Sequence, residues 1–329
     1  MKLKTEGLAL VILITLIVVT GLGVFLAWRG HQDGLTLHAR TAEQGGWEPA
    51  AITARVGEPL NLRLTSDDVT HSFSVGKLNM QPVDVYPGEV TELMLTFDRP
   101  GKYVYYCTRW CGPNHWRMRG TIEVMSPDGA LAGPQPEQSP LYVELNLDID
   151  APHPASATPE SKPSGLESQA LLELLPENIR SLNYWRSHSP GEVWQALRQE
   201  PFTEGLSDQR VWDLVAAFWQ ANTSQERLDL GAELYAQNCA ACHGEGGAGD
   251  GVFANQMEAM AETGISGHEL KTPTDFTDPD TMLGASPALL QGKIVRGGMG
   301  TGMPYFGPIF TQDQMWAIVD YLYAFQFGQ

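Results

Sequence analysis

Basic residues, cysteines and long apolar runs are all scarce in this chain of 329 residues. Lysine and arginine number 21 against 39 aspartate and glutamate residues, so the formal net charge is −18 at pH 7. Because phosphate binding needs a basic surface, this balance argues against a nucleic-acid partner. The acidic balance is consistent with basic protein partners, or with charge that only keeps the protein soluble. The four cysteines all lie in two ligand-rich motifs, which leaves none for a structural disulfide.

A single apolar run, at residues 7–28, is long enough to cross a membrane. Its 22 residues carry no charge, and a helix of that length rises roughly 33 Å, close to a hydrocarbon core of ~30 Å. Lys2 and Lys4 indicate a cytoplasmic N-terminus. We therefore expect a single-pass, lipid-embedded anchor in a bacterial cell membrane, with residues 30–329 on the periplasmic side. A cleaved signal peptide is the alternative, but residues 25–29 offer no small-residue cleavage site.

Shifts in residue pattern predict a multidomain chain with one N-terminal transmembrane helix, an all-β domain and an all-α domain. The predicted parts are 1–30 for the cytoplasmic tip and anchor, 31–126 for the β domain, 127–165 for a proline-rich linker, 166–222 for a helical segment and 223–329 for the C-terminal helical domain.

The β domain is predicted from short stretches of alternating polarity between Pro-Gly and Gly-Glu-Pro turns. Such spacing is typical of an antiparallel sandwich or barrel. The expected strands are 51–56, 60–64, 90–97, 103–106 and 121–124, with a further candidate at 142–149 inside the linker. The linker itself is expected to be solvated over 152–163.

Soft metal ligands gather around Cys107 and Cys111; the others are His71, His115 and Met118. This set suits copper, particularly Cu(I), and a mononuclear blue-copper site would use only one cysteine. Two bridging thiolates can instead hold two copper ions that share one electron. A disulfide would leave the other three ligand residues unexplained, and zinc seldom binds methionine.

The stretch from His71 to Val124 resembles the CuA domain of subunit II of haem–copper oxidases. The shared pattern is C-x3-C-G-x2-H-x2-M, with DVTHSF upstream and YPGEV between, over about a quarter of the chain. The resemblance implies a cupredoxin β-barrel. The single anchor is most similar to the ba3-type oxidases, and CuA-containing nitric oxide reductases and nitrous oxide reductase are further relatives.

The resemblance also implies how the ligands divide between two copper ions. The implied ligands are Cys107 and Cys111 as bridges, His71 and Met118 on one copper, and His115 with the backbone carbonyl of Arg109 on the other. Arg109 stands where many of these oxidases carry a glutamate that meets an interface magnesium ion. That departure puts the magnesium ion in doubt here.

Cys239-Ala-Ala-Cys242-His243 has the spacing of a covalent haem attachment site. Two cysteines one helical turn apart can form thioethers to both vinyl groups, and the adjacent histidine can supply the proximal nitrogen. A capping box at Thr223–Glu226 predicts a helix of about 15 residues that delivers the motif. A C-x-x-C pair alone could also be a redox or zinc motif.

Residues 229–325 resemble class I cytochromes c, through G-x3-Y-x3-C ahead of the motif and the glycine-rich stretch 244–251 after it. The resemblance implies a methionine as the sixth haem ligand. Met303, in the segment GTGMPYF, is our choice, and Met299 is the alternative. A thioether ligand raises the haem potential.

Two amphipathic helices, expected at 208–220 and 312–325, look alike. Either two capped helices are similar by chance, or 166–222 is a degenerate cytochrome-like unit, which would lack haem because no C-x-x-C-H precedes residue 207. We expect this segment to be a docking surface whose deletion leaves both redox sites intact.

Two electron-transfer sites, without an open metal position or a general base, predict a carrier that performs no bond chemistry by itself. The resemblance implies subunit II of a respiratory haem–copper oxidoreductase. Electrons would enter from a cytochrome, a cupredoxin or a quinol-oxidising complex and pass through haem c and CuA. A catalytic membrane subunit would then reduce O2 or NO. The alternatives are an anchored, freestanding shuttle, for example to nitrous oxide reductase, and a copper chaperone or sensor.

Overall fold

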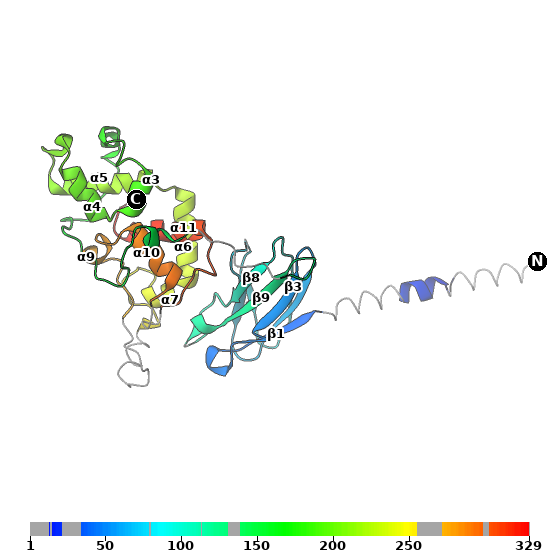
Figure 1. Cartoon of the computed structure of the whole chain (residues 1–329). Helices are drawn as coiled ribbons and strands as arrows, with labels where there is room; N and C mark the ends of the chain where they lie inside the picture. Colours follow the sequence, from blue (N-terminus) through cyan, green and yellow to red (C-terminus); the bar gives the residue numbers. More distant parts are fainter. Residues whose placement is uncertain are drawn as a thin grey trace, which may run out of the picture.

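The computed structural model describes residues 13, 15–21, 34–78, 80–112, 114–130, 139–254, 272–298 and 303–328. Most of the run predicted as an anchor lies outside these residues; Leu13 and residues 15–21 are described, and they are helical. Within the described residues, no helix combines the length and the apolarity needed to cross a membrane. A β domain and a larger helical domain follow (Figure 1).

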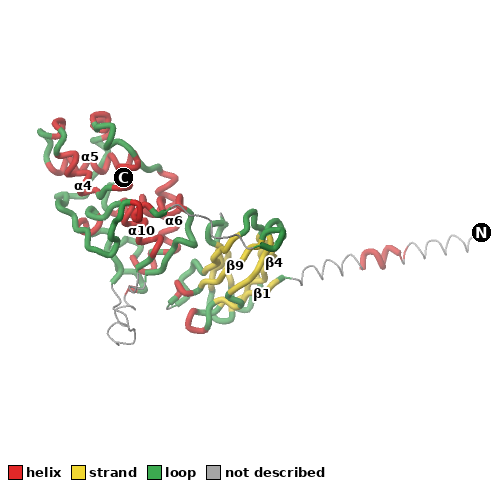
Figure 2. The backbone as a smooth tube through the Cα atoms, in the orientation of Figure 1, coloured by secondary structure: helices red, strands yellow, loops and turns green. Residues whose placement is uncertain are grey.

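The β domain consists of two sheets, with strand orders β2-β1-β4-β7 and β3-β9-β8-β5-β6 (Figure 2). The strands are β1 (Leu35–Ala39), β2 (Trp47–Glu48), β3 (Ala51–Arg55), β4 (Leu60–Ser66), β5 (His71–Val75), β6 (Val83–Val85), β7 (Thr91–Leu95), β8 (Gly101–Tyr106) and β9 (Arg119–Met125). Each of the five expected strands occurs within two residues of its predicted ends. The expectation of an antiparallel domain is corrected in part, because β1–β4 and β3–β9 are parallel pairs. Turn residues in the sequence indicate pairing only between strands that follow each other along the chain. The strands of these two pairs do not follow each other directly.

The two sheets enclose one apolar core, since inward and outward positions alternate along each strand. In β9, Ile122 and Val124 are fully buried, whereas Glu123 between them is partly exposed. The Tyr105 ring fills the space beside Gly120 and allows no side chain there. The Tyr105 hydroxyl donates a hydrogen bond to the Pro49 carbonyl at 2.5 Å. This packing anchors the end of β8 that leads into the first cysteine motif.

The helical domain is organised by its own set of short helices. They are α2 (Leu141–Glu144), η3 (Gln169–Leu174), α3 (Leu182–Ser187), α4 (Pro190–Arg198), η4 (Pro201–Thr203), α5 (Asp208–Ala221), α6 (Gln225–Asn238), α7 (Ala240–His243), α9 (Pro279–Met282), α10 (Pro287–Arg296), α11 (Gln312–Leu322) and η5 (Tyr323–Phe325). The two look-alike helices are α5 and α11 followed by η5. The predicted cap of α6 is wrong by one residue, because Ser224, not Thr223, accepts the hydrogen bond from the Arg227 amide.

Helices α6 and α11 cross at close range. Gly231 lies at the crossing, where an added Cβ would overlap the Ala317 carbonyl oxygen and stand 2.7 Å from Tyr321 Cβ. Nearby, Arg227 Nε donates to the buried Asp320 carboxylate at 2.9 Å. The crossing is therefore fixed by one glycine and one buried ion pair.

Residues 139–222 pack onto the rest of the helical domain and share its core. The buried residues of that core include Ile149, Trp185, Trp212 and Trp219 together with residues of α10 and α11. The strand considered at 142–149 is not formed; α2 and a turn stand there instead, because Tyr142 and Ile149 pack against Gly292 of α10.

The stretch expected to be a solvated linker follows the surface of the helical domain. Asp150 forms an ion pair with Arg296, and the Ala155 amide donates to the Asp280 carbonyl. A β-bridge between Ser164 and Gly328 holds the C-terminal end of this stretch on the domain. These bonds tie residues 148–164 to the domain.

We expect Trp219→Ala to destabilise the helical domain by about 3–5 kcal/mol, the usual cost of removing a large buried aromatic side chain. Trp219 is 0% exposed, and its indole Nε1 donates to the Asp320 carbonyl. Thermal unfolding measures the change, with Leu166→Ala as the control because Leu166 is 68% exposed. Equal melting of the two variants would show that 166–222 is an appendage.

Candidate functional site

The first cysteine motif lies in the loop between β8 and β9. Cys107 directly follows β8, Cys111 lies in the loop, and His115 opens the 3-10 helix η2 (His115–Arg117). Met118 ends that turn and precedes β9. His71 opens β5, and the antiparallel pairing of β5 with β8 brings it beside Cys107. Two separated sequence motifs therefore meet at one end of the β domain.

The ligand atoms of this motif converge. Cys111 Sγ lies 3.3 Å from His115 Nδ1 and 3.1 Å from Met118 Sδ. Cys107 Sγ lies 3.2 Å from the Arg109 carbonyl oxygen and 3.9 Å from His71 Nδ1. Donor atoms that share one metal ion at bond lengths of 2.0–2.3 Å stand roughly 3–4 Å apart. All four cysteines are free, so both sulfurs here are available to a metal.

Hydrogen bonds orient the donors before any metal binds. His71 Nε2 lies 2.7 Å from Asp68 Oδ1, which leaves Nδ1 facing the cysteines. The Asp68 carboxylate also accepts the Thr41 and Val69 amides, both at 2.6 Å. Burial acts to lower the pKa of His71, but its hydrogen bonds to Cys107 and Asp68 outweigh burial and raise that pKa. Such outer partners fix the tautomer of a ligating histidine.

The pKa values of the two thiols are shifted in opposite directions. The hydrogen bond from the Cys111 thiol lowers the pKa of Cys107, and the same contact, together with burial, raises the pKa of Cys111. Cys107 is thus the more readily ionised of the two, and both sulfurs would be thiolates in a metal site. The Ser72 amide, 3.4 Å from Cys107 Sγ, donates to that sulfur. A set of two thiols, two imidazoles and a thioether, with His71, Cys107 and Met118 buried, fits copper.

The side chain of Arg109 points away from the cysteines and pairs with Asp84. Its Nη2 donates to both carboxylate oxygens, at 2.9 and 3.0 Å. A guanidinium binds no metal cation, and here it occupies the neighbouring carboxylate. The residues present do not fit a magnesium ion at this position.

The second cysteine motif is delivered by α6 and α7. Cys239 closes α6 through its amide, which donates to the Tyr235 carbonyl at 2.8 Å, and α7 carries Cys242 and His243. The Tyr235 hydroxyl donates to the Gly244 carbonyl at 2.7 Å and holds the far end of the motif. Burial raises the pKa of Cys239 to about 12 and that of Cys242 to about 11. Both are therefore neutral thiols at pH 7.

His243 is held in one orientation. Its Nδ1 lies 3.0 Å from the Thr274 carbonyl oxygen, which can only accept, so Nδ1 carries the proton. Its ring stacks on Phe276 with the centroids 4.5 Å apart. Burial lowers the pKa of His243 and keeps the imidazole neutral. The Nε2 lone pair is therefore free for a metal ion, which fits a haem iron.

Met303 lies in the extended segment ahead of α11, and its side chain is half-buried. Its carbonyl accepts a hydrogen bond from the Gly298 amide at 3.2 Å. Gly297, with φ of 75°, lets the Met303 and Pro304 backbone approach to 2.8 Å from where its Cβ would be. Met299, the alternative ligand, lies outside the described residues.

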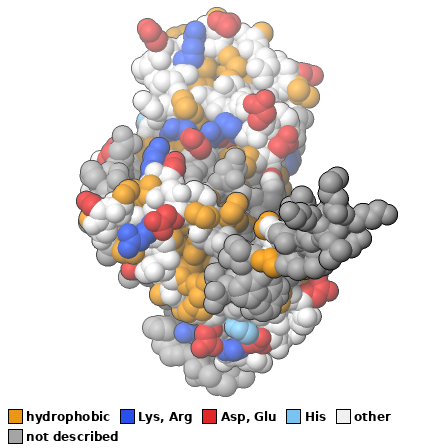
Figure 3. All heavy atoms as spheres, turned by 90° about the vertical axis from the view of Figure 1, so that its right-hand side faces the viewer, with side chains coloured by type: hydrophobic (Ala, Val, Ile, Leu, Met, Phe, Trp, Pro, Cys, Tyr) orange, Lys and Arg blue, Asp and Glu red, His pale blue; other side chains and the backbone are white. Residues whose placement is uncertain are grey.

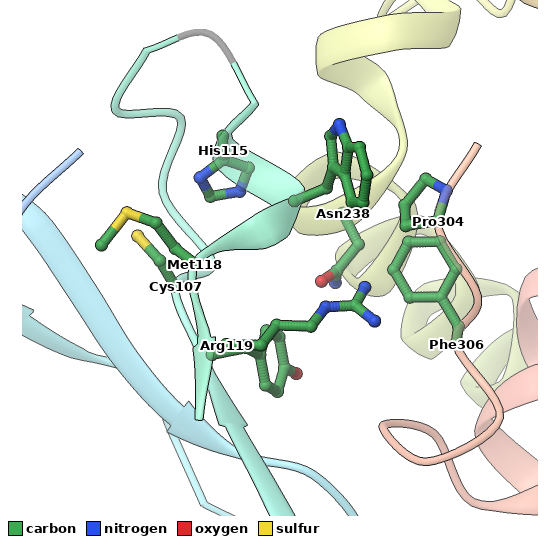
Figure 4. Close-up of a pocket in the computed structure, with 9 residues that line it drawn as sticks. Cys107, His115, Met118, Arg119, Asn238, Pro304 and Phe306 are labelled. Carbon is green, nitrogen blue, oxygen red and sulfur yellow. The ribbon is translucent and has the colours of Figure 1, made fainter. Parts of the chain in front are cut away.

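The copper loop faces residues next to the second motif across the domain boundary. A cavity of about 30 Å³ lies between them (Figure 4). From the β domain it is lined by Tyr106, Cys107, His115, Trp116, Met118 and Arg119, and from the helical domain by Asn238, Pro304 and Phe306. Asn238 precedes the first haem-motif cysteine and Pro304 follows Met303.

An aromatic contact also crosses the boundary. The Trp110 ring lies 5.7 Å from the His115 ring and 5.2 Å from the Phe253 ring, measured between centroids. Phe253 follows the haem motif, and its amide donates to the Ala241 carbonyl. Sequence spacing gave no signal for this contact or for Thr274, because both depend on distant segments. Asp68 was visible only as part of DVTHSF.

Fold and donor sets together define a cupredoxin-like β domain followed by a helical cytochrome c domain. Residues 48–125 match the family described as the periplasmic domain of cytochrome c oxidase subunit II, and residues 228–325 match the family described as cytochrome c. The β domain therefore matches the periplasmic domain of cytochrome c oxidase subunit II, and the helical domain matches cytochrome c, in agreement with the two motifs.

Two relatives from Thermus thermophilus are each named cytochrome c oxidase subunit 2. Both are 42% identical over 79 residues, which are 24% of this chain and 58% and 46% of the relatives. The chain thus spans about half the length of the curated relatives it matches.

Two solved structures are similar to parts of this chain. A heme–copper terminal oxidase dimer is similar at 26% identity over 37% of this chain and 98% of that chain, with a TM-score of 0.25. The periplasmic domain of subunit II of cytochrome oxidase from Bradyrhizobium japonicum is similar at 20% identity over 29% of this chain and 86% of that one, with a TM-score of 0.24.

Proposed function

We propose that this chain is the electron-transfer subunit of a terminal haem–copper oxidoreductase. It takes electrons from a donor at its haem c site, passes them to a binuclear copper site, and delivers them to a catalytic membrane subunit that reduces O2 or NO. The observation that carries the proposal is the shared cavity: residues next to both motifs line one gap of about 30 Å³ between the domains. Two carriers held this close exchange electrons within one molecule.

The proposed copper ligands are those that the structure brings together. Cys107, Cys111, His71, His115, Met118 and the Arg109 carbonyl would hold the two copper ions. When bound, such a pair would take up one electron. The chain orients the donors through Asp68 and the Ser72 amide, and it buries His71, Cys107 and Met118.

The proposed haem ligands are Cys239 and Cys242 as thioethers, with His243 and Met303 as axial ligands. A bound haem takes up and releases one electron. The chain fixes the His243 tautomer through Thr274 and shields the ring with Phe276. A thioether ligand keeps the haem potential high enough for it to serve the copper site.

We further propose that residues 7–28 anchor the chain in a bacterial cell membrane, with both domains on the periplasmic side. Leu16, Ile17, Val18 and Val19, within the described part of that run, are 57–62% exposed. Exposed apolar side chains on a helix match a lipid environment.

The donor is proposed to be a cytochrome, a cupredoxin or a quinol-oxidising complex. Figure 3, viewed from the side of the N-terminal segment, shows acidic and basic side chains interspersed on that face. The acidic side chains that give the net charge of −18 therefore do not form a purely acidic patch on that face. We expect the donor to meet another face of the molecule.

Gas consumption by the complex isolated through a tag on this chain tests the proposal. Steady O2 uptake with a reduced cytochrome donor is the expected result for an oxidase subunit, and NO uptake with little O2 uptake would make the catalytic partner an NO reductase. A His243→Ala chain in the same complex should lose donor-driven uptake. Isolation of this chain alone, with copper and haem bands and no uptake of either gas, would favour a freestanding shuttle.

A further inference from the structure

Arg119 is the residue that joins the copper loop to the segment carrying Met303. It directly follows Met118 and opens β9. Its Nη1 donates a hydrogen bond to the Tyr305 carbonyl oxygen at 2.8 Å. Its guanidinium carbon lies 5.1 Å from the centre of the Tyr305 ring and 5.6 Å from that of Phe306. Figure 4 shows this side chain reaching from the copper loop toward the helical domain.

The Arg119 cation is held without an acidic partner. Among the described residues, no carboxylate lies within ion-pair distance of it. The side chain is half-buried, and burial lowers the pKa of its guanidinium. An ordinary surface arginine would pair with an acid or face water. This one is satisfied by a carbonyl and two aromatic rings of the opposite domain, and such contacts exist only while the domains are docked.

The contact also makes a bonded link between the copper loop and the Met303 segment. It runs from Met118 through one peptide unit into Arg119, along the Arg119 side chain, across one hydrogen bond to Tyr305, and along two residues to Met303. The aromatic link through Trp110 instead crosses two gaps between rings, from His115 and to Phe253. A second backbone contact, from the Lys77 amide to the Ile309 carbonyl at 2.8 Å, docks the domains but touches neither motif.

We propose that Arg119 is a positioning residue that docks the helical domain on the copper loop and thereby sets the rate of electron exchange between the two sites. The inference rests on the proposed function. It assigns a task to one side chain outside both sets of proposed ligands. Arg117, two residues earlier, offers a matched control, because it is exposed and lies over Trp116 of its own loop.

The test compares Arg119→Met and Arg119→Lys with Arg117→Met in the full chain loaded with copper and haem. After light-driven reduction of the haem, the exchange rate is read from the haem and copper absorption bands. We expect the Arg119→Met rate to fall roughly tenfold or more, since a charge-assisted hydrogen bond is lost. The lysine variant should recover part of it, and Arg117→Met should match the unchanged chain.

A second readout needs no cofactor. In the metal-free, haem-free chain, small-angle scattering should show a larger radius of gyration for Arg119→Met than for Arg117→Met, because the domains separate more often. Exchange in Arg119→Met as fast as in the control, with an unchanged radius, would overturn the inference. So would slowing by Trp110→Leu alone. Absence of any exchange in the unchanged chain would instead refute the proposed function.

Discussion

Replacement of Cys107 by serine should abolish the paired copper site and leave the helical domain intact. Cys107 Sγ lies within 3.9 Å of His71 Nδ1, the Arg109 carbonyl and the Ser72 amide. A serine hydroxyl does not ionise near pH 7 and is a hard ligand that copper(I) binds poorly. We expect bound copper to fall from two ions per chain to one or none, with loss of the thiolate-to-copper absorption.

Metal analysis of the purified chain and its visible spectrum measure this result. The control is Ser126→Ala, because Ser126 is a β-domain residue whose side chain hydrogen-bonds to Asp128 and Ala130 of its own turn. The haem band should be unchanged in both variants. Two copper ions per chain in Cys107→Ser, with an unaltered spectrum, would contradict the assignment of Cys107 as a bridge.

Alanine at Gly231 should destabilise the helical domain, although the same change stabilises most exposed helices. In an open helix, alanine is favoured over glycine by about 1 kcal/mol. Here the new methyl group would overlap the Ala317 carbonyl oxygen of α11. The helices must separate, and overpacking of this kind costs about 1–3 kcal/mol. Whether Gly231→Ala lowers or raises the stability of the helical domain therefore shows how closely α6 and α11 cross.

Thermal unfolding followed by circular dichroism measures the change. Gly205→Ala is the matched control, since an added Cβ there meets no atom within 4 Å and its φ is not left-handed. We expect the control to melt at or above the temperature of the unchanged chain and Gly231→Ala to melt below it. Separation of α6 also moves Cys239, so haem incorporation should fall as well. A Gly231→Ala chain as stable as the control would show that α6 and α11 do not cross closely.

Much of the fold was predictable because local sequence patterns determine where its strands and helices form. Alternating polarity located five strands to within two residues, and periodic apolar residues located α5 and α11. Clustered ligand types predicted both donor sets before any geometry was known. The family matches at 48–125 and 228–325 agree with those two motifs.

Other features could not be read from local patterns. The parallel pairs β1–β4 and β3–β9 join strands far apart in the chain. Residues 142–149 alternate like a strand, yet Tyr142 and Ile149 pack on α10 and hold a helix and a turn there. The core shared by 139–222 with the rest of the helical domain depends on contacts such as Trp219 with Asp320, 101 residues apart.

Local sequence patterns indicate which chemistry this chain can support, because ligand identity and spacing are local properties. Two thiols, an imidazole and a thioether lie in one motif, a second imidazole lies upstream in DVTHSF, and C-x-x-C-H forms the other motif. The relation between the two sites depends on the tertiary structure. It brought Arg119, next to Met118, into a hydrogen bond with the Tyr305 carbonyl, and Trp110 against Phe253. Such contacts arise from the docking of whole domains, where surface shape and an unpaired cation select the partner face, and no local spacing encodes that.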